Sequence, residues 1–213
     1  MEFIKELIFP KFCVNCQREG NYLCEDCFSL IDFPTYTPQK ANNLVGLFWA
    51  LPYNNFIIKK LIAQFKYQPF VKDMAATLAS LIIHYIKLNE KQMFFSDRDV
   101  IVPIPLTKKR LKERGFNQAE EIGRELSSFL KIPLASNVLF KVKETLPQVE
   151  LSKEEREKNV KEAFAVRNND QIKDKKVLIL DDVYTTGSTM AEAARVLKES
   201  GAKQVWGVAV ARE

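Results

Sequence analysis

Two adjacent carboxylates and a hydroxyl-rich turn follow a short apolar run near the end of the sequence. Residues 177–180 are Val-Leu-Ile-Leu, and after them come Asp181, Asp182, Thr185, Thr186, Gly187, Ser188 and Thr189. Carboxylates accept hydrogen bonds from sugar hydroxyls and attract Mg²⁺. Backbone amides at the start of a helix favour a phosphate, because the helix dipole is positive there. The pattern predicts a site for a ligand that carries both a ribose and a phosphate.

A second group of charged residues follows another apolar run. Five cations occupy seven positions, as Lys108, Lys109, Arg110, Lys112 and Arg114. A solvated basic turn is the usual outcome of such a run. The guanidinium group, however, suits bidentate contacts with phosphate, and the run lies in a predicted loop between a strand and a helix. We therefore expect a phosphate-binding loop that acts mainly through its two arginines.

All four cysteines form two C-x-x-C pairs, Cys13 with Cys16 and Cys24 with Cys27. Four thiolates this close together suit a tetrahedral Zn²⁺ site, and a segment this short would gain its folding free energy from the metal. Redox-active thiols or a disulfide pair are the alternative interpretations. A site filled by four cysteines leaves no position for a substrate, so we expect a structural or an interaction module.

Composition sets the broad class. The chain has 213 residues, of which 46% are apolar, which allows one α/β core and a small accessory module. Its formal charge of +5 suits a phosphate-bearing partner without demanding nucleic acid. Glu2, Lys5 and Glu6 interrupt the apolar N-terminus, and the apolar run at 78–86 is too short for a bilayer. These features predict a cytoplasmic protein without membrane insertion.

The elements that must position these residues alternate along the chain. Apolar runs predict strands at 44–51, 100–104, 138–142, 177–180 and 205–211, and helical spacing predicts helices at 56–65, at 73–88, after Asn117 and before Gly201. Asn117 with Glu120, and Thr189 with Glu192, match capping boxes. Residues 144–162 lack core periodicity, which predicts a mobile surface segment. The alternation favours a parallel sheet with helices on both faces.

Domain boundaries follow from the irregular stretch at 28–43. We expect a helix and the four-cysteine zinc module at 1–40 and the main domain at 41–213, with a hood at about 44–98 and a core at about 99–213. The one histidine, His84, is isolated from other polar residues. This excludes a mechanism that needs a histidine dyad or triad.

The aspartate doublet and its turn resemble the phosphoribosyl-pyrophosphate (PRPP) motif of type I phosphoribosyltransferases. The resemblance implies the type I phosphoribosyltransferase fold, a twisted and mostly parallel sheet covered by helices on both faces. It also implies that Asp181 and Asp182 hold the ribose, that residues 185–189 hold the 5′-phosphate, and that Mg²⁺ accompanies PRPP. The basic loop would bind pyrophosphate through Arg110, Arg114 and Lys109. In a catalytic protein the two aspartates would be catalytic residues.

Four features in order resemble the ComF (ComFC) family of competence proteins. They are the paired cysteine motifs, the run 102–106 leading into 114–118, the stretch with Gln148, Arg156 and Asn159, and the aspartate motif. The resemblance implies a cytoplasmic bacterial protein that assists uptake of single-stranded DNA in natural transformation, with a helicase-like competence ATPase as partner. It also implies that Gln148, Arg156 and Asn159 lie in a flexible active-site loop.

Three functions remain open at this point. The first is a competence protein that binds PRPP and single-stranded DNA. The second is a Mg²⁺-dependent metabolic phosphoribosyltransferase with an acceptor that the sequence does not identify. The third is a non-catalytic regulator that senses PRPP. Glu2, where a glutamine-using enzyme would have a cysteine, argues against an amidophosphoribosyltransferase. Lys66 and Tyr67 are the only hood residues that suggest contact with a ligand.

Overall fold

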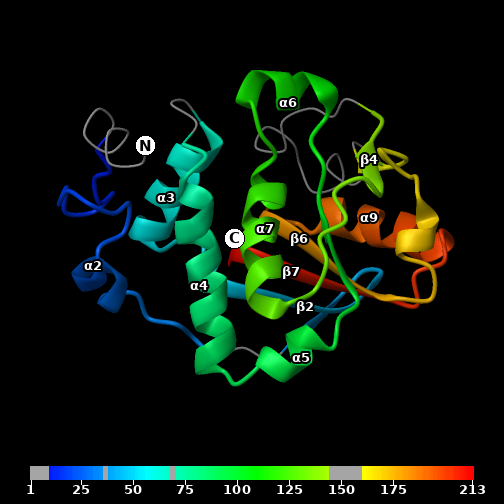
Figure 1. Ribbon diagram of the computed structural model, residues 1–213, viewed down its shortest axis with the longest axis horizontal. Coiled ribbons are helices and arrows are strands. Elements are labelled where there is room, and N and C mark those ends of the chain that lie inside the picture. The colour runs from blue at the N-terminus through cyan, green and yellow to red at the C-terminus, as the bar shows by residue number, and fades with distance from the viewer. Residues whose placement is uncertain (1–9, 36–37, 68–70, 144–159) are drawn as a thin grey trace.

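The centre of the molecule is a five-stranded sheet, shown in Figure 1. The computed structural model describes residues 10–35, 38–67, 71–143 and 160–213. The strand order is β1-β2-β7-β6-β3, formed by β1 (Gln39–Ala41), β2 (Leu44–Pro52), β7 (Gln204–Arg212), β6 (Lys176–Tyr184) and β3 (Val100–Pro103). Every pairing is parallel except that of β1 with β2. The predicted mostly parallel sheet is therefore confirmed.

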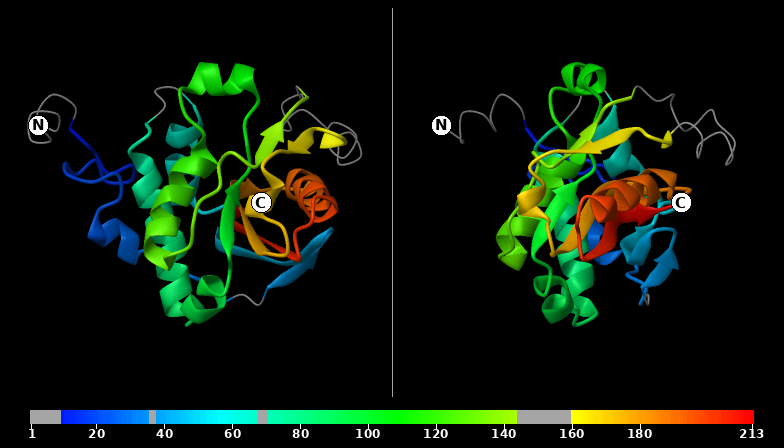
Figure 2. Two further views of the ribbon diagram at one scale, coloured as in Figure 1. Left: turned by 45° about the vertical axis from the view of Figure 1, so that its right-hand side comes forward. Right: turned by 90° about the vertical axis from the view of Figure 1, so that its right-hand side faces the viewer.

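Helices cover both faces of the sheet, as Figure 2 also shows. One face carries α3 (Phe56–Lys66), α4 (Met74–Leu88), α5 (Gln92–Ser96) and α7 (Gln118–Leu130), and the other carries α9 (Ser188–Glu199). Successive strand residues point to opposite faces, so Leu178 joins the core under α4 and α7 while Val177 and Ile179 join the core under α9. Apolar residues on both faces are typical of a strand buried within a parallel sheet.

The basic run is a helix and not the loop that the sequence predicts. It forms α6 (Lys108–Arg114), which contains no buried residue. The Thr107 hydroxyl accepts a hydrogen bond from the Arg110 amide at 3.3 Å, and Gly115 ends the helix with a φ of 78°. The predicted strand at 138–142 exists as β4 (Leu139–Lys141), paired antiparallel with a strand that was not predicted, β5 (Phe164–Val166). A 3₁₀ turn, η2 (Asn169–Gln171), precedes β6.

The capping prediction at α9 is wrong, and the one at α7 is half right. Gly187 is the N-cap of α9, with a φ of 78°, and Thr189 already lies within the helix. Glu192 instead accepts hydrogen bonds from Arg195. At α7, the Asn117 side chain accepts from the Ala119 amide at 3.1 Å and so caps the helix. The Glu120 carboxylate pairs with Arg124 (2.5 Å) and does not close the predicted box.

The four-cysteine segment packs against the first helices of the main sheet. It includes α2 (Glu25–Ser29), and its buried residues share one hydrophobic cluster with α3 and α4. The Lys60 ammonium donates a hydrogen bond to the Val14 carbonyl at 3.1 Å. The His84 ring of α4 contacts the rings of Phe28 and Phe33, with centroids 4.9 and 4.5 Å away. The division of the chain near residue 40 stays a prediction.

Two further expectations are a hood at about 44–98 and a chain without a membrane-spanning helix. Strand β2, which belongs to the segment expected as a hood, is paired with β7 inside the sheet. Within the described residues, no helix has both the length and the hydrophobicity that a bilayer span requires.

Candidate functional site

The aspartate doublet lies near the carboxyl end of β6, between β3 and β7. The strand is longer than the sequence predicts: Asp181 still pairs with Ala209, and the ladder continues to Tyr184. Residues 185–187 then bend into the first turn of α9. In open parallel sheets, ligands bind beyond the carboxyl ends of the strands. In this protein, β6 passes into α9 at that edge of the sheet.

A pocket of about 360 Å³ joins the doublet to the two arginines of α6. We call it the aspartate pocket; among its lining residues are Asp181, Asp182, Arg110, Arg114, Thr185, Gly187 and Thr189. Lys109, Thr186 and Ser188, also predicted as site residues, are not part of its wall. Gln148, Arg156 and Asn159 lie outside the described residues. The structure therefore brings together most of the predicted phosphate and ribose contacts.

Lys66, at the end of α3, faces the doublet. Its ammonium lies 2.8 Å from the Asp182 carboxylate, which is only 8% exposed. Burial opposes the positive charge, but attraction to Asp182 and Asp181 outweighs it and raises the pKa of Lys66. The Asp182 carboxylate also accepts a hydrogen bond from the Val183 amide at 2.7 Å. The only sign of Lys66 in the sequence is its place next to Tyr67 in the segment expected to form the hood.

Asp181 has a raised pKa. Burial and the neighbouring Asp182 charge raise its pKa to about 7, although Lys66 opposes this shift. Two carboxylates side by side resist simultaneous ionisation, and one ammonium compensates only one of them. A cation or a hydrogen-bond donor from a ligand would relieve this repulsion. The doublet is thus suited to bind sugar hydroxyls or a divalent ion.

Arg114 is held in place by α7. Its guanidinium donates to the Gln118 side-chain carbonyl at 3.0 Å, and the buried Gln118 amide donates in turn to the Phe65 carbonyl at 3.2 Å. Burial lowers the pKa of Arg114, but a guanidinium remains charged at neutral pH. The contacts link α6, α7 and α3 around the pocket. Gln118 was not predicted as a functional residue; here it orients a cation.

The turn at the start of α9 requires glycine. Gly187 has a φ of 78°, and a methyl group at this position would overlap the Tyr184 ring and hydroxyl. The hydroxyls of Thr186 and Ser188 lie 2.8 Å apart. The first amides of a helix have no acceptor within the helix, so this turn can direct several N–H groups at an anion.

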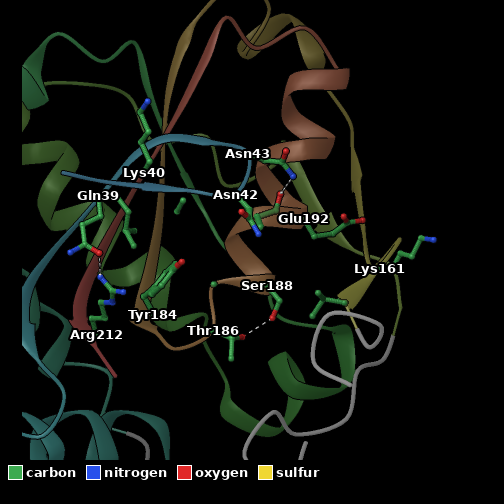
Figure 3. A pocket seen from close by; sticks show the side chains of 15 residues that line it. Gln39, Lys40, Asn42, Asn43, Lys161, Tyr184, Thr186, Ser188, Glu192 and Arg212 are labelled. Atoms are coloured by element: carbon green, nitrogen blue, oxygen red, sulfur yellow. Dashed lines mark hydrogen bonds between the residues drawn. The ribbon is translucent and has the colours of Figure 1, made fainter. Parts of the chain in front are cut away.

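A second pocket adjoins the same turn, and Figure 3 shows the residues that line it. Its volume is about 460 Å³, and we call it the hairpin pocket because the β1–β2 hairpin forms one wall. Its polar lining residues are Gln39, Lys40, Asn42, Asn43, Lys161, Tyr184, Thr186, Ser188, Glu192 and Arg212. Tyr184 and Gly187 line both pockets. The two predicted turn residues absent from the aspartate pocket, Thr186 and Ser188, are found here.

The four cysteines form a compact group that could hold a metal ion. Their sulfur atoms all lie within 4.8 Å of one another, and three of the side chains are buried. A tetrahedral ion with metal–sulfur bonds of 2.3 Å would place sulfurs about 3.8 Å apart, so small side-chain movements suffice. The Asn15 side chain donates to the Cys27 sulfur at 3.3 Å, as an outer partner of a metal ligand would. The donor set fits a metal ion.

Comparison with known proteins agrees with this architecture. The family model "Phosphoribosyl transferase domain" matches residues 79–212. Competence protein F of Haemophilus influenzae is 36% identical over 205 residues, which cover 94% of this chain and 85% of that protein. DNA utilization protein YhgH of Salmonella typhimurium is 35% identical over 136 residues, 63% of this chain and 59% of the relative. A purine phosphoribosyltransferase from Pyrococcus horikoshii aligns with a TM-score of 0.35 and 18% identity, over 69% of this chain and 85% of that one.

The sheet order, the site at the end of β6 and the domain match define a phosphoribosyltransferase-like protein. The four-cysteine group at its N-terminus is a further feature that the sequence predicted. Within this class, the chain belongs to the ComF family of competence and DNA utilization proteins. The family recognised from the order of motifs is thereby confirmed.

Proposed function

We propose that the aspartate pocket binds PRPP together with Mg²⁺. The supporting observation is that one pocket joins Asp181, Asp182, the first turn of α9 and the arginines of α6. PRPP carries ribose hydroxyls, a 5′-phosphate and a pyrophosphate. Carboxylates suit the hydroxyls, helix amides suit the 5′-phosphate, and Arg110 and Arg114 suit the pyrophosphate. Each part of the ligand thus has a chemically matched partner in the pocket.

Lys66 takes a particular part in this proposal. In the free protein its ammonium compensates Asp182 at 2.8 Å. When Mg²⁺ and the ribose hydroxyls bind the doublet, they help to compensate its negative charge. The Lys66 ammonium then becomes available to bind a phosphate oxygen. The pocket would therefore exchange an internal ion pair for contacts to the ligand, which limits the desolvation cost of binding.

Titration calorimetry with PRPP and Mg²⁺ tests the proposal. We expect saturable binding to the wild type and at least a tenfold loss of affinity in the double variant Asp181→Ala, Asp182→Ala. A matched control is Asp170→Asn with Asp174→Asn, because both of these carboxylates are exposed and neither lines the pocket. The control should bind as the wild type does. Equal affinity in the aspartate variant and the wild type would remove the proposed site.

We also propose that the metal bound by the four cysteines is Zn²⁺ and that the segment at 1–40 is a structural or interaction module. The tetrahedral thiolate set is typical of structural zinc sites. Elemental analysis of the purified protein should give one zinc per chain, and Cys16→Ser with Cys24→Ser should lose it. Another metal in its place, or retention of zinc by that variant, would contradict the assignment.

The biological role that we propose is assistance to single-stranded DNA uptake in natural transformation. It is supported by the family and by the net charge of +5, which suits a phosphate-bearing partner. A helicase-like competence ATPase is the expected partner. Deletion of the gene in a transformable host should lower transformation frequency, and the aspartate double variant should fail to restore it. Full restoration by that variant would show that the role in DNA uptake does not depend on PRPP binding.

A further inference from the structure

The hairpin pocket begins where a phosphate bound by the α9 turn would end. Thr185 and Thr189 line the aspartate pocket, whereas Thr186 and Ser188 line the hairpin pocket. The turn at 185–189 is therefore a wall common to both, with Tyr184 and Gly187 at the edge between them. A phosphate held by this turn would join a ribose on one side and could carry a second group on the other.

The walls of the hairpin pocket are rigidly attached to the sheet. The Asn43 side chain donates to the Ala191 carbonyl at 3.1 Å and fixes the hairpin to α9. The Arg212 guanidinium lies over the rings of Trp49 (4.5 Å) and Tyr184 (5.7 Å), and it donates to the Gln39 side chain. Figure 3 shows Gln39, Asn43, Tyr184 and Arg212 among the residues around the pocket. Asn43 and Arg212 are thus held in place at the wall of the pocket.

The charge of this pocket favours an anion. Among the described residues of its lining, Lys40, Lys161 and Arg212 are cations, and Glu192 is the one carboxylate. Arg195 donates to both Glu192 oxygens at 2.7 and 2.9 Å and also pairs with Glu199, so it compensates the Glu192 charge in part. The side-chain amides of Gln39 and Asn42 add neutral donors and acceptors. Cations beside amides and a tyrosine suit a phosphate followed by a nucleoside.

The volume is larger than a phosphate requires. At about 460 Å³ the pocket lies within the range of small-molecule sites. PRPP would leave it empty, because the 5′-phosphate of PRPP is a terminal group. The site as a whole therefore has room for a ligand that extends beyond this phosphate.

We infer that the paired pockets bind a ribose 5-phosphate unit whose phosphate is linked to a second nucleoside, either directly or through a further phosphate. The inference rests on the proposed function of the aspartate pocket, which would hold the ribose with its free 2′ and 3′ hydroxyls. The hairpin pocket holds the second nucleoside and its phosphate. Two sources share this chemistry: a nucleoside diphosphate sugar such as ADP-ribose, in which a second phosphate makes the link, and the 3′ end of an RNA strand, in which the link is a phosphodiester.

Calorimetric titration of three probes tests the inference. They are ribose 5-phosphate, ADP-ribose and a triribonucleotide with a free 3′ end. We expect the wild type to bind ADP-ribose, the triribonucleotide or both tenfold or more tightly than ribose 5-phosphate. The double variant Lys40→Gln, Lys161→Gln should lose this advantage and keep its affinity for ribose 5-phosphate. Both lysines are exposed, so the variant should fold. The probe that gains affinity identifies the source.

A charge-matched control separates this effect from a general loss of positive charge. In Lys198→Gln with Lys203→Gln both side chains are exposed and line neither pocket, so the tenfold advantage should persist. Equal affinity of the wild type for all three probes would overturn the inference, as would an undiminished advantage in the Lys40, Lys161 variant. If PRPP and all three probes fail to bind, the proposed function itself has failed.

Discussion

At the scale of single residues, the site depends on groups that would be unfavourable elsewhere. Asp181 and Asp182 place two carboxyls side by side, with Lys66 at 2.8 Å from the second of them. Gly187 adopts a left-handed backbone that brings it against Tyr184. The doublet costs stability in the free protein, because two adjacent carboxyls resist ionising together, whereas glycine adopts the left-handed backbone without strain. They can be tested one residue at a time.

Asp181→Asn should stabilise the protein at pH 8 and leave it nearly unchanged at pH 4.5. The folded pKa of about 7 exceeds the usual value of 3.8, so the folded state keeps a proton that the unfolded chain releases. The free energy of unfolding therefore falls as pH rises from about 4 to about 7, and the variant avoids this loss. Because Asp181 is partly exposed, we expect a gain of about 1–2 kcal/mol at pH 8.

Urea denaturation at the two pH values measures this effect. A gain that is equal at pH 4.5 and pH 8 would show that the titration of Asp181 is not its cause. PRPP affinity gives a second reading: it should rise between pH 6 and pH 8 more steeply in the wild type than in the variant. Protonation of the ligand itself affects both proteins alike.

Gly187→Ala should destabilise the protein more than Gly115→Ala does. Both glycines have a φ of 78°, so both variants carry the strain of a left-handed residue, about 1 kcal/mol. A methyl group at 115 meets no atom within 4 Å, whereas one at 187 overlaps Tyr184. We expect a total loss of about 2–4 kcal/mol at 187. Equal losses in denaturant titrations would mean that Tyr184 moves aside freely.

At the scale of elements, α6 is the part of the site that packing holds least firmly. It spans seven residues with no buried side chain, yet it carries Arg110 and Arg114 into the aspartate pocket. Its position depends on its two ends, Thr107 at the start and Gly115 at the finish, and on the contact between Arg114 and Gln118. By contrast, α7 and α9 are fixed by residues buried against the sheet.

Thr107→Ala should loosen α6 without unfolding the domain. The loss of an N-cap costs about 1 kcal/mol, which corresponds to about a fivefold weaker PRPP affinity if α6 must be ordered to bind. Hydrogen exchange of the α6 amides should become faster, while that of β6 stays the same. Thr107→Ser keeps the hydroxyl and should behave like the wild type. Unchanged α6 exchange in the alanine variant would show that the cap is not what holds this helix.

At the scale of the whole molecule, the four-cysteine segment and the α/β sheet share one hydrophobic cluster. Cys13, Cys24 and Cys27 belong to the same buried group as Leu61 and Leu81. Lys60 and His84 add contacts between α3, α4 and the segment. The segment thus extends the core of the main domain, and its stability should be linked to that of α3 and α4.

Removal of the metal by a strong chelator should therefore lower the melting temperature of the whole protein. A metal that binds only the folded state stabilises it, and the loss passes to α3 and α4 through the shared cluster. We expect a decrease of several degrees in calorimetry and a single transition, which re-addition of metal should reverse. An unchanged main transition with a separate small one would show that the segment melts independently.

The sequence by itself determined the features that depend on neighbouring residues. Apolar runs on both faces of 177–180 required a buried parallel strand, and the order of motifs identified the family. The cysteine spacing predicted the compact sulfur group, and Asn117 predicted the start of α7. These patterns are local because backbone propensity, capping and ligand spacing act over a few residues.

Only the tertiary structure decided which distant residues meet. It brought Lys66 from the end of α3 to Asp182, and it made Gln118 the partner of Arg114. It placed Gly187 instead of Thr189 at the start of α9, because the left-handed backbone at Gly187 turns the chain into the helix two residues earlier than predicted. The hairpin pocket joins Lys40, Lys161 and Arg212 through the strand order. Such contacts arise from the packing of whole elements, which no short run of residues encodes.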